Sequence, residues 1–403
     1  MKVKKLVFVF VFVFVFSLLC AAHNVFAFEH PGVLLNKTDI EFVRQRVSNE
    51  AEPWFSSYKN MLASPLANRI YLPTAKWDSM ACGGPDGEGI AQRCKIERED
   101  ARAAYTQALA WLYSGDNVYA ENSINIMNAW SEQFTGHHTG QNQALQASWA
   151  AAVWARAAEI IKHTYIVDGS SKWNSDKIKK FEHMLRSRYI DDINGQKTDC
   201  HFGNWQAVIT EAKLNSAVFL DDQKLFDESL ERFHKYFPTY VYLYSDGGLP
   251  KPIAGCYSHD ELDKFNSYWS ITNKTTPLKQ GHAQETCRDL EHLAYGIAGF
   301  VNTAQTAYVQ GVDLYSQEKE RFISVMEFNS ALDMAGNRDL LNECGMNVPV
   351  LGGLKGTMHI AYNHLSKING VYLPNTEKWL LENGSQRPQG FFHYLWEELT
   401  HTK

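Results

Sequence analysis

Residues 204–237 read NWQAVITEAKLNSAVFLDDQKLFDESLERFHKYF, which is an alanine-containing apolar segment, an acidic break and a charged amphipathic segment. This pattern predicts two helices joined by a short turn. Residues 101–134 and 292–329 repeat the design, with their breaks at SGD and GVD. The chain is therefore expected to contain repeated helical hairpins. Their breaks, roughly 100 residues apart, lie near Asp116, Asp222 and Asp313.

A helical hairpin of this kind cannot bury its apolar face alone, so neighbouring hairpins must stack or curl around one another. Alanine-rich helices suit an inner ring, whereas charged helices suit an outer ring. We therefore expect an all-α fold, an α/α toroid that forms an incomplete barrel of hairpins. Short strands are expected only in residues 238–250 and 369–374. No Pro- or Gly-rich linker follows the leader, so residues 28–403 are expected to form one domain.

The first 27 residues have the features of a secretory signal peptide. Three lysines precede an apolar run that reaches Leu19, and Val25 and Ala27 fit the two key positions of a cleavage site. Cleavage after Ala27 would give a secreted or periplasmic protein with no stable membrane insertion. The alternatives are an uncleaved signal anchor and a lipid attached at Cys20.

Composition limits the partners and cofactors that the chain can use. A net charge of −6, with no long basic run after the leader, argues against nucleic acid as a partner. Six cysteines remain after the leader, and export permits disulfides. Cys82 and Cys94 flank a glycine-rich stretch, which favours a bridge between them. Neither CxxC nor HExxH occurs, so no metal site and no cofactor are predicted. The protein is expected to be a monomer.

One stretch, GHAQETCRDLEHLAYG at residues 281–296, carries an unusual set of polar side chains. Spacings of three, four and three residues predict that these side chains form a stripe on one face of a helix. Apolar residues on the opposite face would pack into the core, and Gly296 and Gly299 would leave space beside the stripe. The stripe comprises Glu285, Arg288, His292 and Tyr295.

Three other segments concentrate polar and aromatic side chains: residues 134–149, 198–206 and 245–269. Each candidate also has an ordinary explanation. Asn204 can cap the following helix, Arg288 can form a local ion pair, and Tyr295 can pack in a core. His259 can be an ordinary loop histidine, and His137-His138 can be a solvated loop.

Together, these amide, imidazole, guanidinium and phenol groups fit one chemistry. The proton α to a carboxylate becomes labile only when the carboxylate is neutralised and the enolate-like intermediate is stabilised. Asn and Arg supply that electrostatic stabilisation, and His or Tyr transfers the protons. A nearby Arg would also favour the phenolate form of Tyr. The set therefore indicates a lyase for uronate polysaccharides, which needs no metal.

The chain resembles the alginate-lyase superfamily of secreted, helical-toroid polysaccharide lyases. The resemblance covers nearly the whole chain after the leader. It rests on short motifs in a shared order, namely HPGVLLNKTDIEFVRQRVSNEAEPW, QALQASWAAAVWARAAEII, GNWQAV, CRDLEHLAYGIA with GVDLY after it, AYNH and LPNTEKW.

The resemblance implies a cleft for an anionic polysaccharide and roles for individual residues. Asn204 and Arg288 would neutralise the uronate carboxylate, and Tyr295 would transfer protons. The catalytic histidine would be His259, as in glucuronan-cleaving relatives, or else His201, although here Cys200 replaces the Asn that precedes it in bacterial alginate lyases. The remaining candidates, expected to bind substrate or to hold the catalytic groups, are Gln141, Trp149, His201, Trp205, Tyr257, Tyr268, Glu285 and His292, with Trp269 as a further stacking platform.

The expected activity is endo-acting cleavage of 1,4-linked uronate chains by β-elimination, on alginate (polymannuronate) or glucuronan. In mannuronate and glucuronate the C5 proton and the leaving oxygen share one side of the ring, so one tyrosine can serve both transfers. In guluronate they lie on opposite sides, so two proton-transferring groups would be needed. The alternatives are an α/α-barrel glycoside hydrolase, for which no carboxylate pair stands out, and a non-catalytic glycan-binding protein.

Overall fold

The computed structural model describes residues 27–83, 88–195, 198–248, 278–336, 358–383 and 392–403, with short stretches at 253–256, 265–266, 269, 343–344 and 353–354. Of the expected signal peptide, residues 1–27, only Ala27 lies within the described residues. No helix in the described ranges combines the length and apolar character that crossing a membrane requires.

The described chain is built almost entirely from helices, as the sequence predicts. The α-helices are α1 (Lys37–Ser48), α2 (Trp54–Leu62), α3 (Glu88–Ser114), α4 (Asn117–Gln133), α5 (Gln143–Thr164), α6 (Ser175–Met184), α7 (Asp191–Gly195), α8 (Asn204–Phe219), α9 (Gln223–Tyr240), α11 (Leu290–Val309), α12 (Leu314–Gln317), α13 (Lys319–Ala335), α15 (His359–Tyr362), α16 (Pro374–Asn383) and α17 (Glu397–His401). Short 3-10 turns span Pro65–Ala67, Thr198–Cys200 and Tyr244–Asp246, and π-helical turns span Leu185–Ile190 and Asn363–Ile368.

Strands are few and short. β1 (Met80–Ala81) pairs in parallel with β2 (His138–Thr139), and β3 (Ile166–Val167) pairs antiparallel with β4 (Ser170–Ser171). The expected strand at residues 238–250 is reduced to an isolated bridge between Val241 and Ala283. The strand expected at residues 369–374 is absent from the described structure, where that segment leads into α16.

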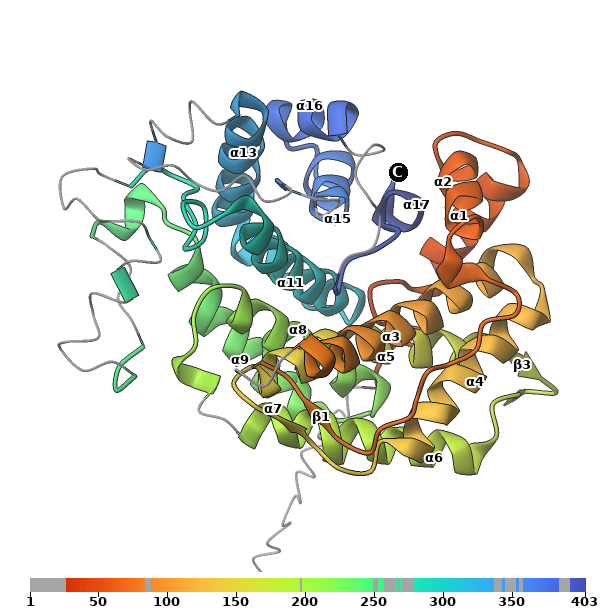
Figure 1. Cartoon of the computed structure of the whole chain (residues 1–403). Coiled ribbons are helices and arrows are strands. Elements are labelled where there is room, and N and C mark those ends of the chain that lie inside the picture. The colour runs from red at the N-terminus through yellow and green to blue at the C-terminus, as the bar shows by residue number, and fades with distance from the viewer. Residues whose placement is uncertain are drawn as a thin grey trace, which may run out of the picture.

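Four helices form the inner layer of the fold. α3 packs on α5, α5 on α8, and α8 on α11, while α4 and α9 pack on the outer sides of α3 and α8 (Figure 1). α5, α8 and α11 are buried on nearly every side, whereas α9 is buried on one face only. This confirms the expected division into alanine-rich inner helices and charged outer helices, because only small side chains let helices pack closely on all sides.

An aspartate begins the second helix of each repeated hairpin. Asp116, Asp222 and Asp313 are the N-cap residues of α4, α9 and α12, and each side chain accepts a hydrogen bond from a backbone N–H of the first turn. A side-chain oxygen at this position satisfies an N–H that has no partner within the helix. The predicted hairpin breaks are therefore confirmed, with α12 continuing into α13.

The first described segment is bonded to α11, and α2 is bonded to the C-terminal segment. The Leu34 N–H donates to Thr306 Oγ1 at 3.2 Å, and the Glu29 N–H donates to Gln310 Oε1 at 2.9 Å, which attaches the N-terminal segment to α11. Trp54 Nε1 donates to the Thr402 carbonyl at 3.1 Å. Contacts between residues far apart in sequence therefore join the N-terminal part of the chain to α11 and to the C-terminal segment.

Glycines bring α11 into direct contact with its neighbours. A Cβ atom on Gly299 would lie 2.6 Å from the Ala207 backbone of α8, and one on Gly296 would lie 2.0 Å from the Tyr240 hydroxyl. The expectation that Gly296 and Gly299 leave open space beside the polar stripe is therefore wrong. The space is filled by packed neighbours, because close helix packing needs positions without side chains.

Gly296→Ala is expected to destabilise the protein by about 1–3 kcal/mol, since the added methyl group must displace the buried Tyr240 ring. Urea unfolding followed by circular dichroism measures this change. Gly248→Ala is the control, because a Cβ atom there meets nothing within 4 Å. Equal midpoints for the two variants would contradict the packing argument.

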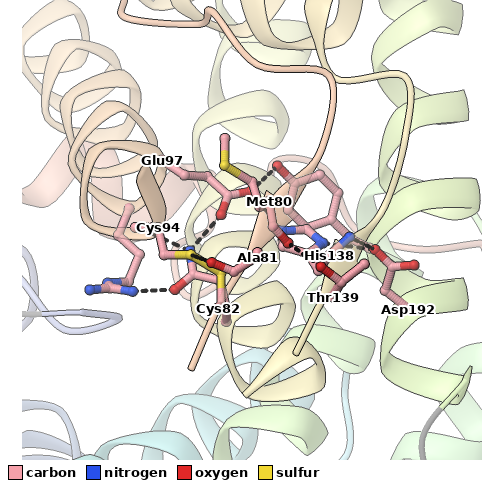
Figure 2. The surroundings of a disulfide bond; sticks show 11 residues. Met80, Ala81, Cys82, Cys94, Glu97, His138, Thr139 and Asp192 are labelled. Carbon is pink, nitrogen blue, oxygen red and sulfur yellow. Dashed lines mark hydrogen bonds and ion pairs between the residues drawn. A yellow bond between two sulfur atoms is a disulfide. The ribbon is translucent and has the colours of Figure 1, made fainter. Parts of the chain in front are cut away.

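A buried charged cluster lies beside the disulfide between Cys82 and Cys94. This bridge was predicted from the sequence and is present. Figure 2 shows His138 between Glu97 and Asp192, with Nε2 2.9 Å from Glu97 Oε1 and Nδ1 2.8 Å from Asp192 Oδ2. His138 is fully buried, so the interpretation of His137-His138 as a solvated loop is wrong for His138.

Burial lowers the pKa of His138, but the charges and hydrogen bonds of Glu97 and Asp192 outweigh burial and raise it to about 9. The folded protein thus holds a proton that the unfolded chain releases near pH 6.5. The resulting stabilisation, on the order of 3 kcal/mol, is fully present below pH 6.5 and is lost as the pH rises through 9.

The melting temperature of the wild type is therefore expected to fall between pH 6.5 and 9, and His138→Gln should flatten this part of the profile. Differential scanning calorimetry across the pH range provides the measurement. His183→Gln, at an exposed histidine of α6, should follow the wild type. Parallel wild-type and His138→Gln profiles would show that His138 is neutral in the fold.

Candidate active site

The GNW motif forms the start of α8. Gly203 has a φ of 65°, and a Cβ atom there would lie 2.7 Å from the Glu285 carboxyl group. Both the positive φ and the close approach therefore require glycine. The N–H groups of Gly203 and Asn204 donate to Gln284 Oε1 at 2.7 Å and to Glu285 Oε2 at 2.8 Å. Two side chains from residues 284–285 thus cap this helix.

Asn204 does not cap α8, in contrast to the ordinary explanation of the sequence. It is the first residue of the helix, and its side-chain amide donates to Glu285 Oε1 at 2.7 Å. Arg288 Nη1 donates to the same oxygen at 3.0 Å. The amide and the guanidinium predicted to bind a substrate carboxylate therefore already meet on an internal carboxylate.

Glu285 is fully buried, and burial raises the pKa of its carboxyl group. Arg288, His292 and Asn204 lower that pKa, but burial has the larger effect, so the pKa lies above its ordinary value. Every polar neighbour of the carboxyl group donates to it, including the Tyr240 hydroxyl at 3.4 Å from Oε2. Such a set of donors fits the ionised form. Arg288, by contrast, has 40% of its side chain exposed and can reach a ligand.

The predicted stripe on one helix is only partly correct. α11 begins at Leu290, with Asp289 as its N-cap, so Glu285 and Arg288 lie in the turns that precede the helix. Only His292 and Tyr295 are helical. The four side chains still come together, because the turn folds back over the start of α8.

His292 connects the turn to the helix. Its Nε2 lies 3.0 Å from Arg288 Nη2, and its Nδ1 lies 2.7 Å from Asp289 Oδ2. Because arginine can only donate, Nε2 accepts and Nδ1–H donates to Asp289. Burial raises the pKa of Asp289, but the hydrogen bonds from His292 outweigh it and leave that pKa below its ordinary value. The arrangement orients both Arg288 and His292.

Tyr295 lies one helical turn further on, in an aromatic cluster. Its ring contacts Trp149, Phe392 and Tyr394, with centroids 6.2, 4.8 and 6.1 Å away. Its hydroxyl donates to Glu291, and the ring of His292 lies 5.5 Å from its own. The structure therefore joins the tyrosine to the Asn204–Glu285–Arg288 cluster through His292.

The expected ease of ionisation of Tyr295 is wrong for the structure as described. Burial, followed by the hydrogen bond to Glu291, raises the pKa of Tyr295 well above its ordinary value. The neighbouring Tyr394 and the acidic side chains act in the same direction. The phenol therefore carries its proton, which is the form that a general acid requires.

The remaining candidates from the sequence lie in different surroundings. His201 stacks on Trp205, with ring centroids 4.0 Å apart, and it lines a small hollow together with Gly203 and Gln284. Gln141 is exposed at the start of α5. Trp269 is buried against Tyr242, Phe265 and Leu278, so its expected use as a stacking platform is wrong. Three candidates lie outside the described residues, namely Tyr257, His259 and Tyr268.

Sequence reasoning missed several neighbours of Tyr295. Glu291 could have been found, since residues four apart face each other on a helix. Arg98 lies 4.7 Å from the centroid of Phe392 and 5.5 Å from that of Trp149. Burial lowers the pKa of Arg98 to about 10. No local pattern connects Arg98 or Phe392 to α11, because they lie far from it in sequence.

Comparison with known proteins identifies the family. The model of the alginate lyase family matches residues 65–332, which include Asn204, Glu285, Arg288 and Tyr295. The chain belongs to the alginate lyase family. As a member of this family it is a polysaccharide lyase, so the activity expected from the sequence is confirmed at this level. A search of curated proteins finds no match.

Solved structures confirm the α/α toroid fold of this alginate lyase family member. The structure of alginate lyase A1-III from Sphingomonas species A1 has a TM-score of 0.60 and 12% identity, with 94% of this chain and 97% of that chain covered. A histidine-to-alanine variant of alginate lyase A1-III, complexed with a tetrasaccharide, has a TM-score of 0.58 and 15% identity, with 91% and 94% covered. A tyrosine-to-phenylalanine variant with a tetrasaccharide has a TM-score of 0.55 and 15% identity, with 87% and 95% covered.

Asn204→Ala is expected to lower kcat/KM of this lyase by about 100- to 1,000-fold, the usual effect of removing one preorganised donor from an active site. Steady-state kinetics on a polymer that the wild type cleaves measures this loss of kcat/KM. Asn215→Ala is the matched control, because Asn215 is another buried amide of α8, bonded to the Ala152 carbonyl and far from Glu285. If both variants lost similar stability and neither lost kcat, Asn204 would have a structural role.

Proposed function

We propose that this protein cleaves 1,4-linked polyuronates by β-elimination, with Asn204, Arg288 and Tyr295 at the reacting sugar. The observation that carries the proposal is the convergence of Asn204 and Arg288 on the Glu285 carboxylate, next to the helix that bears Tyr295. A site that already binds one carboxylate through an amide and a guanidinium has the donors that a uronate carboxylate needs.

Carboxylate binding is assigned to Asn204 and Arg288. Glu285 and His292 position them, since Glu285 accepts from Arg288 Nη1 and His292 accepts from Arg288 Nη2, each at 3.0 Å. The exposed part of Arg288 presents its remaining N–H groups to the substrate. Neutralising the substrate carboxylate lowers the energy of the enolate-like intermediate that forms when the C5 proton leaves.

Proton transfer is assigned to Tyr295. The C5 proton passes to the Tyr295 oxygen as the C4–O4 bond breaks and the phenol gives its own proton to O4, so Tyr295 ends as a neutral phenol and a double bond is left between C4 and C5. The hydrogen bond to Glu291 supports this role, because it orients the phenol and, together with burial, keeps it in the protonated form that can donate to O4. His259 and His201 remain proposals for an assisting histidine.

The geometry favours substrates whose C5 proton and leaving oxygen lie on the same side of the ring, namely mannuronate in alginate or glucuronate in glucuronan. Among the described residues around Tyr295, one phenol can reach both atoms, and the His292 imidazole is bound to Arg288 and Asp289. The tetrasaccharide complexes of alginate lyase A1-III support alginate as the first polymer to test.

We also propose that the protein is exported after cleavage following Ala27, and that residues 28–403 act as a single-domain monomer. Three disulfides, Cys82–Cys94, Cys200–Cys256 and Cys287–Cys344, support an oxidising compartment.

The test measures ultraviolet absorbance of the 4,5-unsaturated product after incubation with polymannuronate, glucuronan, polyguluronate or hyaluronan. Absorbance should rise with polymannuronate or glucuronan, and Tyr295→Phe should lower kcat by about 100- to 10,000-fold. Tyr308→Phe, at a partly exposed tyrosine of α11, should retain the wild-type rate.

Each other outcome contradicts part of the proposal. Cleavage of polyguluronate alone would overturn the same-side geometry and require a second proton-transferring group. New reducing ends without ultraviolet absorbance would indicate a hydrolase. Binding of polymer without new ends would indicate a glycan-binding protein.

A further inference from the structure

A second polar cluster lies at the far end of α5 from the aromatic cluster. Glu159 and His163 are four residues apart and so share one face of α5, about 15 Å along the helix from Trp149. His30, from the segment before α1, lies against them, and its ring stacks on that of His163 with centroids 4.2 Å apart. One potential ligand atom from each of the three lies within 4.8 Å of the others.

Two atoms of this cluster are buried without a hydrogen-bond partner, Glu159 Oε2 and His163 Nε2. They face each other at 3.7 Å. Glu159 is fully buried, and its other oxygen accepts from the Gly32 N–H at 3.0 Å and lies 2.6 Å from His30 Nδ1. A buried carboxylate oxygen and an imidazole nitrogen without partners are costly unless something lies between them.

We propose that His30, Glu159 and His163 bind a divalent transition-metal ion, with Zn²⁺ as the best fit. Imidazole nitrogens and a carboxylate oxygen are ligands that zinc accepts at about 2.0–2.2 Å, which places tetrahedral ligands about 3.4 Å apart. The 3.7 Å pair needs little movement to meet that spacing. His30 turns its Nδ1 from Glu159 Oε1 toward the ion and releases its proton, and a water molecule takes the fourth position.

The surroundings of His30 match those of a metal ligand. Its second nitrogen, Nε2, lies 3.0 Å from Asp221 Oδ1, in the turn between α8 and α9. Metal-bound histidines commonly donate their other N–H to a carboxylate, which fixes the tautomer and the ring orientation. Glu159 and Asp221 carry two negative charges, which a divalent ion balances when both histidines are neutral.

The site has a structural role. His30 belongs to the N-terminal segment, Glu159 and His163 to α5, and Asp221 to the turn after α8, so an ion here attaches that segment to two inner helices. No spacing motif in the sequence indicates this site, because His30 lies 129 residues before Glu159. The proposal does not depend on the proposed function, since the site lies away from Tyr295.

The alternative is a simple ion pair, in which a protonated His30 lies between Glu159 and Asp221 and His163 is neutral. Burial, with the charge of a protonated His30 beside it, lowers the pKa of His163 to about 3, so His163 is neutral in this ion pair. The two arrangements differ in what His163 does. It is a ligand in the first and only a stacking partner in the second.

The test uses the full chain after leader removal, stripped with a chelator and then mixed with Zn²⁺ or Co²⁺. We expect one zinc ion per chain after gel filtration, a melting temperature raised by about 4 °C at saturating zinc, and visible absorption bands of tetrahedral Co²⁺. His163→Gln and Glu159→Gln should abolish all three effects. His183→Gln, at an exposed histidine of α6, should retain them.

Zinc effects of equal size in wild type and His163→Gln would overturn the site, as would the absence of zinc binding by the wild type. If a variant fails to fold, the cobalt spectrum of the wild type decides the question, because an ion pair produces no visible bands. Lyase activity of the zinc-free protein is expected to persist at temperatures below its melting point, which separates this result from the outcome of the polymer assay.

Discussion

The candidate active site depends on the buried Glu285 carboxylate. Its Oε2 accepts the backbone N–H of Asn204, and its Oε1 accepts both the Asn204 side-chain amide and the Arg288 guanidinium. It thereby joins the start of α8 to the turn before α11. The disulfide between Cys287 and Cys344 and the hydrogen bond from Thr286 to Asn329 hold that turn. Without this carboxylate, nothing would hold the Asn204 amide and the Arg288 guanidinium next to each other.

An internal carboxylate also explains how such a site stays organised without substrate. Donors aimed at a fixed negative charge do not need to reorient when a second carboxylate arrives. The cost is the burial of a charge, which the surrounding donors offset only in part. Tyr295 has the opposite environment, since aromatic rings and a carboxylate keep its phenol neutral. The anion-binding groups and the proton-transferring group are thus tuned separately, although they share α11 and the turn before it.

Local patterns in the sequence predicted the helices, the hairpin breaks at the three aspartates and the disulfide between Cys82 and Cys94. The chemistry of the polar side chains, together with the family resemblance, selected Asn204, Arg288 and Tyr295 as candidate site residues. Local patterns failed where a distant segment decides the local structure. The spacing of Glu285 and Arg288 fits a helix, but Asp289 caps α11, and the preceding turn bends to meet Gly203. The burial of His138 between Glu97 and Asp192 and the contact of Phe392 with Tyr295 involve residues tens to about 100 positions apart. No periodicity encodes such contacts.

The attachment of the N-terminal segment to α11 has a kinetic consequence. Residues 29–34 bond to residues 306–310, and Trp54 bonds to Thr402, so the closing contacts span some 270–350 positions. Contacts this distant form late, because a long loop must be ordered before they contribute any stability. A chain still emerging from the ribosome can pair α3 with α5 and α5 with α8, but it cannot yet form the contacts that span the whole chain. The protein should therefore gain its full resistance to proteases only in the last step of folding, when these contacts form.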